Sequence, residues 1–492
     1  MRPKYYLLLG LLATTLIALT LSMQSEVNNR VHQHLTPLPT KTCTHDDSVF
    51  CTHLPLLSID TVSSEMPSPF TTDTKGNQVF STEEVSASLQ VFDSTTTMNH
   101  LTDTPTLTSD TIVHYRGNSS RTFDKKGISL TLTHSDASNR ELSLLGMAAD
   151  ADWVLHGPYL DKTLLRNYMW YNIAGECMPY SPNVRFCELF LNGEYLGIYV
   201  LMEKIDYSDE GRVPISFTPN NSPSTSYIFK IDRGDIPITS IFEPFSIYSG
   251  RLISGYGSSN IFEITFPSKT DLIPSQRTFI EDNISQFEKA LYSFDYKHPI
   301  YGYKHWINAT AFMDYFILNE FTTNYDSMGL STYFYKDING KLTPVVWDFN
   351  SSADNYQSIQ INPNTFQYPN RIWYQMLLKD EKFVSGLIAR YRSLRQTYLS
   401  DDYLFEYIDD VIAYLGPAIT RNYEKWGYIF EDTPEYNYLS PTSRNPRSFE
   451  QAVEQLKSFI IERGTFMDQQ IETLYQYSHP SVNKKFNHEG DT

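Results

Sequence analysis

The sequence predicts an α+β protein in which a β-rich region is followed by a helical region. Between residues 54 and 266 most segments alternate apolar and polar residues over short runs, with Thr- and Ser-rich turns between them. This period of two is typical of strands. After Pro274, apolar residues recur at helical spacing instead. Because strands and helices are separated along the chain, we expect two halves that pack together and hold a ligand between them.

The individual elements follow from these patterns. A small antiparallel unit is expected from strands at residues 54–60, 78–80, 87–92, 111–115 and 127–133, and further strands at 227–231 and 261–266. A helix is expected at residues 161–174, where an acidic residue at the start complements the helix dipole. The later helices are expected at about residues 275–294, 309–323, 372–398, 402–415 and 447–476.

Two hairpins are expected within this order. Asn192-Gly193 separates two apolar alternating runs within residues 186–203, and Asn-Gly is the strongest short hairpin signal. The second hairpin joins residues 332–336 to residues 342–347 through a turn at 337–340.

The N-terminus indicates export. Arg2 and Lys4 precede an uncharged run that ends at residue 22, which is typical of a signal peptide or an N-terminal membrane anchor. We therefore expect the protein to be extracytoplasmic, either secreted or anchored, with membrane contact through this segment only. The rest of the chain is interpreted as a linker at 23–53, a β-rich region at 54–150, a main domain at 151–476 and a disordered tail at 477–492.

The composition excludes some partners. The formal net charge is −18, from 39 basic and 57 acidic residues, and a field of this sign repels nucleic acid. An anionic nucleotide can bind such a chain where a metal ion and a local basic group offset the acidity.

The four cysteines fall into two local pairs. Cys43 with Cys51, and Cys177 with Cys187, suit two short-loop disulfides in an oxidising compartment. Free thiols are one alternative. A zinc site is another, with His45 and His53 joining Cys43 and Cys51, although this spacing matches no standard zinc pattern.

Several residues are candidates for chemistry. Asp348 and Asn350 follow an apolar strand and offer hard oxygen ligands of the kind Mg²⁺ prefers, but a turn or a helix cap would use the same residues. Asp326 ends a helical run just before the second hairpin, where a turn residue is the simpler interpretation. An aspartate before a hairpin and another after it is nevertheless the arrangement that a kinase uses.

Basic and glycine-containing segments add further candidates. Phosphates can lie under the Asn192-Gly193 turn, which has a second glycine at Gly197, although an ordinary hairpin needs no ligand. Lys230 lies in an apolar strand and points either to an edge or into a cleft. The basic loop at 116–121 with Lys125 and Lys126 suits an anion or a tight turn. The Walker motif and the ordinary protein-kinase signatures are absent from the sequence.

Taken in order, these segments resemble the spore coat protein H (CotH) kinase family. The matching stretches are residues 53–61, 115–121 with Lys125 and Lys126, 152–155, 161–167, 188–203, Asp326, 333–336 and 346–349. The resemblance spans roughly residues 54–475. It implies an atypical, two-lobed protein-kinase-like fold and an enzyme that uses ATP with Mg²⁺ or Mn²⁺. The implied partner is a protein with a Ser or Thr acceptor, in an envelope, in a coat or among secreted proteins.

The resemblance also assigns roles to residues. It implies that Asp326 is the catalytic aspartate and that Asp348, with Asn350 beside it, binds the metal. Lys230 is similar to the phosphate-binding lysine of the family, and Glu263 to an acidic residue near the nucleotide.

Two positions depart from the family pattern. Many members have a second acid where this chain has Asn350, and an asparagine where it has Thr332. Loss of a carboxylate weakens a metal site. A catalytically weak surface or structural protein that retains the fold for partner binding is therefore the alternative.

Overall fold

The computed structural model describes residues 30–39, 43, 49–63, 65–209, 211–219, 221–233 and 260–479. The expected signal or anchor at 1–22, parts of the linker at 23–53 and the tail beyond residue 479 lie outside the described residues. Within the described ranges, no helix is both long and apolar enough to cross a membrane. The chain divides into two compact units, Met1–His32 and Gln33–Thr492, and the elements that follow all belong to the second.

Seven strands of this unit close into a barrel with the order β1-β4-β5-β6-β7-β9-β8. Their bounds are β1 Leu56–Thr61, β4 Val85–Phe92, β5 Leu107–Arg116, β6 Gly127–Thr133, β7 Asp152–His156, β8 Val184–Leu191 and β9 Glu194–Glu203. Neighbouring strands are antiparallel, and the parallel pairing of β1 with β8 closes the ring. A short ribbon of β2 (Phe70–Thr72) and β3 (Gln78–Phe80) adjoins the barrel in sequence.

Apolar side chains fill the barrel because alternate residues of each strand point inward. Leu57, Leu89, Leu130, Trp153 and Leu201 belong to this inner cluster. β8 is buried along its whole length. Its second face is covered by helix α2 (Arg166–Cys177), whose Tyr168 ring stacks on Phe186 at 4.2 Å between ring centroids.

The β8–β9 hairpin forms at Asn192-Gly193, as the sequence predicts. Both residues have positive φ, 51° and 76°, which is the backbone of a type I′ turn. The Asn192 side-chain oxygen accepts hydrogen bonds from the backbone N–H and the hydroxyl of Thr61, at 2.8 and 3.0 Å. This asparagine therefore fastens the turn to the end of β1.

A second, antiparallel sheet has the order β11-β10-β12-β13. Its strands are β10 Tyr227–Arg233, β11 Asn260–Phe266, β12 Thr332–Lys336 and β13 Thr343–Val345. One face of the sheet is apolar and packs into the largest core cluster through side chains such as Phe229, Ile231 and Phe334. The residues that alternate with these face the other way and include Lys230 and Asp232.

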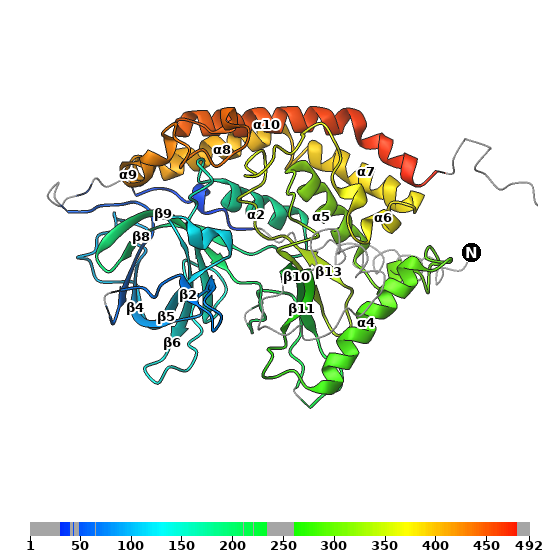
Figure 1. Cartoon of the computed structure of the whole chain (residues 1–492), viewed down its shortest axis with the longest axis horizontal. Coiled ribbons are helices and arrows are strands. Elements are labelled where there is room, and N and C mark those ends of the chain that lie inside the picture. The colour runs from blue at the N-terminus through cyan, green and yellow to red at the C-terminus, as the bar shows by residue number, and fades with distance from the viewer. Residues whose placement is uncertain are drawn as a thin grey trace, which may run out of the picture. The chain divides into compact units, whose positions relative to one another are not determined.

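Helices cover the rest of the unit. They are α2 Arg166–Cys177, α4 Pro274–Tyr292, α5 Ala309–Phe321, α6 Tyr374–Leu377, α7 Glu381–Arg395, α8 Asp401–Leu415, α9 Pro417–Trp426 and α10 Phe449–Gln470. Short 3-10 helices occur at Gln33–Leu35, Ser119–Thr122, Tyr303–His305, Tyr368–Asn370, Gly427–Phe430, Thr442–Arg444 and Ile471–Tyr477. In Figure 1 the barrel and the second sheet lie side by side, with a layer of helices that includes α8 and α10 along one edge of both.

Side-chain caps explain where several of these helices begin. Asn308, Asp380, Ser400 and Ser448 each accept a hydrogen bond from a backbone N–H in the first turn of α5, α7, α8 and α10. The cap at Asp380 also divides the single helix expected at 372–398 into α6 and α7.

The mixed α+β class is confirmed, but the β-rich region is organised differently from the expectation. Strands β7, β8 and β9 belong to the barrel, so a boundary at residues 150/151 falls inside one closed sheet.

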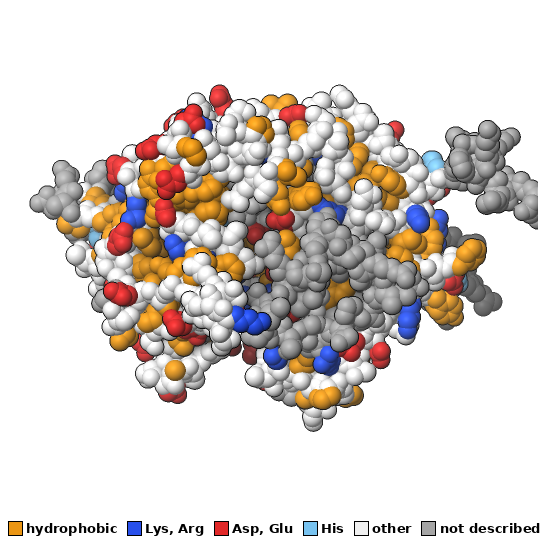
Figure 2. All heavy atoms as spheres, viewed as in Figure 1, with side chains coloured by type: hydrophobic (Ala, Val, Ile, Leu, Met, Phe, Trp, Pro, Cys, Tyr) orange, Lys and Arg blue, Asp and Glu red, His pale blue; other side chains and the backbone are white. Residues whose placement is uncertain are grey.

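Basic and acidic side chains are interspersed across the described part of the face in Figure 2.

The predicted disulfide between Cys177 and Cys187 is wrong. Both residues are free thiols. Cys187 points into the barrel interior, whereas Cys177 packs against the separate helical core at the end of α2. The closed barrel wall between these two cores separates the sulfur atoms despite their closeness in sequence.

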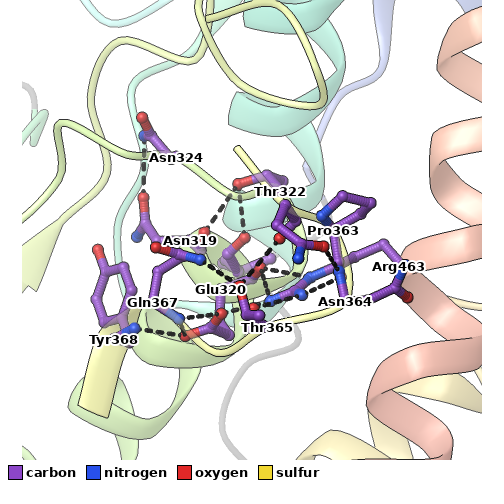
Figure 3. A network of polar contacts seen from close by, with 12 residues as sticks. Asn319, Glu320, Thr322, Asn324, Pro363, Asn364, Thr365, Gln367, Tyr368 and Arg463 are labelled. Atoms are coloured by element: carbon purple, nitrogen blue, oxygen red, sulfur yellow. Dashed lines mark hydrogen bonds and ion pairs between the residues drawn. The ribbon is translucent and has the colours of Figure 1, made fainter. Parts of the chain in front are cut away.

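A fully buried ion pair joins the end of α5 to α10. Arg463 and Glu320 are both 0% exposed, and the guanidinium of Arg463 donates to the Glu320 carboxylate and, at 3.0 and 2.9 Å, to its backbone oxygen. The carboxylate also accepts from the backbone N–H groups of Gln367 and Tyr368, at 2.7 to 3.1 Å. Figure 3 shows how Arg463 reaches from α10 into this network. One charged pair thus fixes α5, α10 and the intervening loop.

We predict that Glu320→Gln destabilises the fold strongly, because it leaves the Arg463 charge buried without its counter-charge. The expected loss in the free energy of unfolding is about 3–5 kcal/mol, measured by urea denaturation. Asp409→Asn is the matched control, since it breaks an exposed ion pair between Asp409 of α8 and Lys457 of α10. Its free energy of unfolding is expected to fall by less than about 1 kcal/mol. Equal losses in the two variants would contradict the role of the buried pair.

Candidate active site

A polar cavity of about 280 Å³ lies between the barrel and the second sheet. The end of β5 and the loop after it, β7, α2 and β9 form one side, and β10, β12 and the loops after α5 and β13 form the other. Its lining residues are Arg116, Gly117, Asn118, Ser119, Ser120, Arg121, His156, Asn167, Tyr171, Met202, Lys230, Asp232, Asp326, Leu330, Ser331, Tyr333, Trp347, Asp348 and Asn350. Acidic and basic side chains therefore line the same cavity.

Helix α2 holds the backbone that carries Asp348. The Tyr171 hydroxyl accepts a hydrogen bond from the Asp348 N–H at 2.8 Å, and the Asn167 side-chain oxygen accepts one from the Phe349 N–H at 2.8 Å. At the start of the same helix, Arg166 donates to the backbone oxygens of residues 352 and 353, at 3.0 and 2.9 Å. Asp348 has a φ of 58°, which a non-glycine residue keeps only when such contacts hold it.

The surroundings of Asp348 disfavour its negative charge. Burial, and then the nearby carboxylates of Asp326 and Asp232, raise the pKa of Asp348 to about 7, while Arg116 opposes this shift. Carboxylates close enough to raise the pKa of Asp348 share a small space with it, and a cation bound among them would relieve the repulsion. Asp348, Asp326 and Asn350 therefore offer oxygens of the kind that a divalent metal prefers, in one cavity.

Asp326 lies in the loop that follows α5. Its backbone oxygen accepts from the N–H groups of Gly329 and Leu330, at 3.1 and 2.8 Å, so the loop turns tightly just after it. The Tyr356 hydroxyl donates to the Asp326 carboxylate at 3.3 Å. Asn324 is tied back to Asn319 of α5 at 3.0 Å, as Figure 3 shows, which places the loop relative to the helix.

Lys230 of β10 places a positive charge in the cavity. Its ammonium group lies 3.4 Å from Glu263 of β11 and 3.8 Å from Asp232. Burial alone would lower the pKa of Lys230, but the neighbouring Tyr333, Asp232 and Glu263 raise it above its ordinary value. The lysine is therefore charged and held at a fixed position by two acids.

The opposite wall carries Arg116 and a neutral histidine. The Arg116 guanidinium lies over the Trp347 ring, 5.9 Å from its centroid. Gly117 follows with a φ of 94°, and a Cβ there would lie 1.9 Å from the Ser120 hydroxyl, so only glycine allows this loop to fold back. Burial lowers the pKa of His156 to about 4, so its imidazole is uncharged at neutral pH.

The structure brings most of the predicted site residues together. Lys230, Asp326, Asp348 and Asn350 line the same cavity, and Glu263 reaches it through its ion pair with Lys230. Arg116–Arg121, singled out only as a possible anion-binding loop, also lines it.

The hairpin turn is not part of this cavity. Asn192 and Gly193 are absent from its lining and lie at the far end of β9 from Met202, roughly 30 Å along a strand that rises about 3.3 Å per residue. Gly197 serves packing instead, because a Cβ there would lie 2.5 Å from the Asn422 side-chain oxygen of α9.

Lys125 and Lys126, the two lysines after the basic loop, also make their contacts outside the cavity. Lys125 is buried and donates to Asn422 at 2.7 Å, and Lys126 donates to the backbone oxygen of Phe123 at 2.8 Å. Neither lines the cavity.

Sequence reasoning missed several cavity residues for which a signal exists. Asp232 lies two positions after Lys230, so a strand at 227–231 that continues by one residue places both on one face. Asn167 and Tyr171 are four residues apart in a predicted helix and therefore share one side of it. His156 had no comparable signal.

A mixed α+β fold thus surrounds one cavity that contains a lysine held by acids, two aspartates and an arginine. The chain belongs to the family described as CotH kinase protein, whose model matches residues 113–467, more than half of the chain. This match contains every residue that lines the cavity. The comparison with curated proteins found no match. Family membership indicates kinase activity and, with it, general use of ATP and a divalent metal.

We predict that Asp348 makes the stability of the metal-free protein depend on pH. Between its ordinary pKa of 3.8 and the folded value of about 7, the unfolded chain has lost the Asp348 proton and the folded chain has kept it. Stability attributable to this residue is therefore present below pH 4 and lost as the pH rises to 7. With EDTA present, the free energy of unfolding of Asp348→Asn, measured by urea denaturation, should equal that of the parent protein near pH 4. At pH 8 it should be higher by on the order of 1–3 kcal/mol.

The control for this measurement is Asp110→Asn, an exposed position on β5. Because this side chain is exposed, the variant should not show the gain in the free energy of unfolding that is expected for Asp348→Asn. If the difference in free energy of unfolding between Asp348→Asn and the parent protein did not change with pH, the raised pKa of Asp348 would be contradicted.

Proposed function

We propose that this protein is an ATP- and divalent-metal-dependent atypical protein kinase that phosphorylates Ser or Thr of an envelope, coat or secreted protein. The observation that carries the proposal is the meeting of Lys230, Asp326 and Asp348 in one cavity, from three separate segments of the chain. The barrel side and the second sheet with its helices would act as the two lobes of a kinase-like fold.

Each residue has a role that suits its position. Asp348, with Asn350, would hold Mg²⁺ or Mn²⁺, which when bound neutralises charge on the transferring phosphoryl group. Lys230 would bind a phosphate oxygen, because Glu263 and Asp232 fix its ammonium group beside the metal ligands. Arg116 would face the phosphates from the barrel side.

Asp326 would act on the acceptor. It accepts the proton of the Ser or Thr hydroxyl as the hydroxyl oxygen bonds to the γ-phosphorus, and the bond from that phosphorus to the β–γ bridging oxygen breaks. ADP leaves with that oxygen. Asp326 suits this role because its loop is anchored to α5 while its carboxylate points into the cavity.

The departures from the family pattern bear on a second candidate function. Thr332 does not line the cavity; its hydroxyl accepts from the Met328 N–H at 2.7 Å and donates to the Leu330 oxygen at 2.9 Å. This contact shapes the Asp326 loop. Asn350 does line the cavity, where an acid would bring a further charge to the metal. Asn350 is therefore the observation that favours a catalytically weak protein that binds partners through the same fold.

We predict that the two aspartates separate binding from turnover. Asp348→Ala should abolish metal-dependent ATP binding and activity, because the phosphates would then face uncompensated acids. Asp326→Asn should leave ATP affinity within a few-fold and lower the rate by roughly 10²–10⁴, the usual worth of a positioned general base. Calorimetric titration of ATP with Mg²⁺ or Mn²⁺, beside an autophosphorylation assay with labelled ATP, measures both quantities.

Asn192→Gly is the control for these variants, because it keeps the positive φ of the hairpin turn and lies outside the cavity. It should bind ATP as the parent protein does. Metal-independent ATP binding, or activity indifferent to both aspartates, would rule out the kinase. Metal-dependent ATP binding without turnover in the parent protein would favour the alternative, a catalytically weak protein.

We propose further that the chain beyond about residue 23 lies outside the cytoplasm, secreted or anchored. The basis is the apolar run that follows Arg2 and Lys4. Protease added to intact cells without an outer barrier should digest the body of the protein, while a cytoplasmic marker stays intact. Complete protection of the protein would contradict this location.

A further inference from the structure

Two cysteines and a histidine meet at the edge of the barrel, away from the candidate active site. The sulfur atoms of Cys43 and Cys51 and a ring nitrogen of His100 all lie within 4.8 Å of one another. The Cys43 sulfur is 3.0 Å from the His100 Nε2. Ligands of tetrahedral Zn²⁺, at about 2.3 Å for sulfur and about 2.0–2.1 Å for nitrogen, lie roughly 3.4–3.8 Å apart. Three atoms that all lie within 4.8 Å of one another are therefore close enough to bind one such ion.

Backbone pairing sets two of these residues opposite each other. Thr52 and Asn99 form an antiparallel bridge, with N–O distances of 3.1 and 2.6 Å. The next residues along each segment, Cys51 and His100, are therefore directly opposed, where side chains come within about 4.5–5.5 Å at their Cβ atoms. The Asn99 side chain strengthens this pairing by donating to the Leu54 oxygen at 2.9 Å.

The segment on the Cys51 side is held independently of any ligand. Arg421 of α9 pairs with buried Glu188 of β8 at 2.7 Å and donates to the Thr52 hydroxyl at 3.2 Å. Its guanidinium also lies over the Phe50 ring, 5.3 Å from the centroid. Residues 50–52 are thus fixed against the barrel, and the Cys51 side chain is placed in advance.

The histidine has the orientation that a metal ligand needs. The Asp103 carboxylate lies 3.0 Å from the His100 Nδ1 and accepts the His100 backbone N–H at 3.0 Å. An Nδ1–H bonded to this carboxylate leaves the lone pair on Nε2, the atom that faces Cys43. A carboxylate behind the ring is the usual outer partner of a zinc-binding histidine.

The sequence suggested a different set of zinc ligands. His53 was paired with the two cysteines, but its Nε2 lies 2.6 Å from the Tyr414 backbone oxygen, and it does not join the group. His45 lies outside the described residues. His100, 49 positions after Cys51 and on the opposite side of an antiparallel bridge, replaces them.

We propose that Cys43, Cys51 and His100 bind a divalent cation of borderline softness, Zn²⁺ in the first instance, with water as the fourth ligand. Binding displaces the two thiol protons to solvent, since thiolates are the metal ligands. The ion fastens the segment that enters the barrel at β1 to the connection between β4 and β5. A disulfide between Cys43 and Cys51 is the competing state, but it gives no role to the imidazole beside Cys43 or to Asp103 behind it.

The test is a Co²⁺ titration of the full chain, purified with a reductant that is then removed. We expect one equivalent of Co²⁺ to give a thiolate-to-cobalt charge-transfer absorption and Zn²⁺ to abolish it by displacement. This signal requires sulfur ligands, so metal bound at Asp348 does not contribute to it. The bound ion should also protect two thiols from alkylation until EDTA is added.

Variants separate a built site from adventitious thiol binding. His100→Gln should abolish the absorption, and Asp103→Asn should weaken Zn²⁺ affinity by about 10–100-fold, as expected for loss of an outer partner. Cys177→Ser, which removes a cysteine that packs against the helical core and lies outside the proposed site, should leave the titration unchanged.

Either of two results would overturn the proposal. One is absence of the cobalt signal in the reduced parent protein. The other is a Cys43–Cys51 linked peptide in a non-reduced digest of protein isolated with Zn²⁺ present.

Discussion

The charge of Arg463 has to be neutralised inside the protein, and the way this is done organises the helical half. A guanidinium with no exposed surface needs both a counter-charge and acceptors for its N–H groups. Glu320 supplies the charge, and backbone oxygens of Glu320, Pro363 and Thr365 supply further acceptors. Glu320 lies one residue before the end of α5 and 143 positions before Arg463. Because Arg463 binds it there, the last long helix helps to fix where α5 ends and the Asp326 loop begins.

The candidate site is built from loops in uncommon conformations that helices hold in place. Non-glycine residues with positive φ gather around the two aspartates: Thr323, Met328, Ser331, Asp348, Ala353 and Asp354. Such conformations cost free energy and persist only where surrounding contacts enforce them. Here the enforcing contacts come from α2, through Arg166, Asn167 and Tyr171, and from the network at the end of α5. The same contacts make the carboxylates a preformed site rather than one assembled on binding.

Periodicity and turn chemistry predicted much of the fold. The Asn192-Gly193 hairpin, the strands at Lys230 and at 332–336 and most of the long helices follow from local signals. The closure of the barrel does not, because parallel pairing of β1 with β8 depends on contacts between residues more than a hundred positions apart. For the same reason sequence spacing misled the pairing of Cys177 with Cys187, which belong to separate cores.

The candidate site was predictable where chemistry and order along the chain coincide. Asp326, Asp348 and Lys230 stand out as an acid before a hairpin, an acid after it and a cation in an apolar strand. Asn192 and Gly193 carried a turn signal that could not distinguish a ligand site from an ordinary hairpin. His156 becomes visible only when segments distant in sequence are brought together.

The closed barrel has a practical consequence for work with fragments of this protein. The family match begins at residue 113, within β5, whereas β1 and β4 precede it. A fragment that starts at the match would lack two neighbouring strands of the ring and would expose the edges of β5 and β8. Unpaired strand edges recruit other chains, so such a fragment is prone to aggregate. Soluble material for biochemistry therefore requires a chain that starts before Leu56.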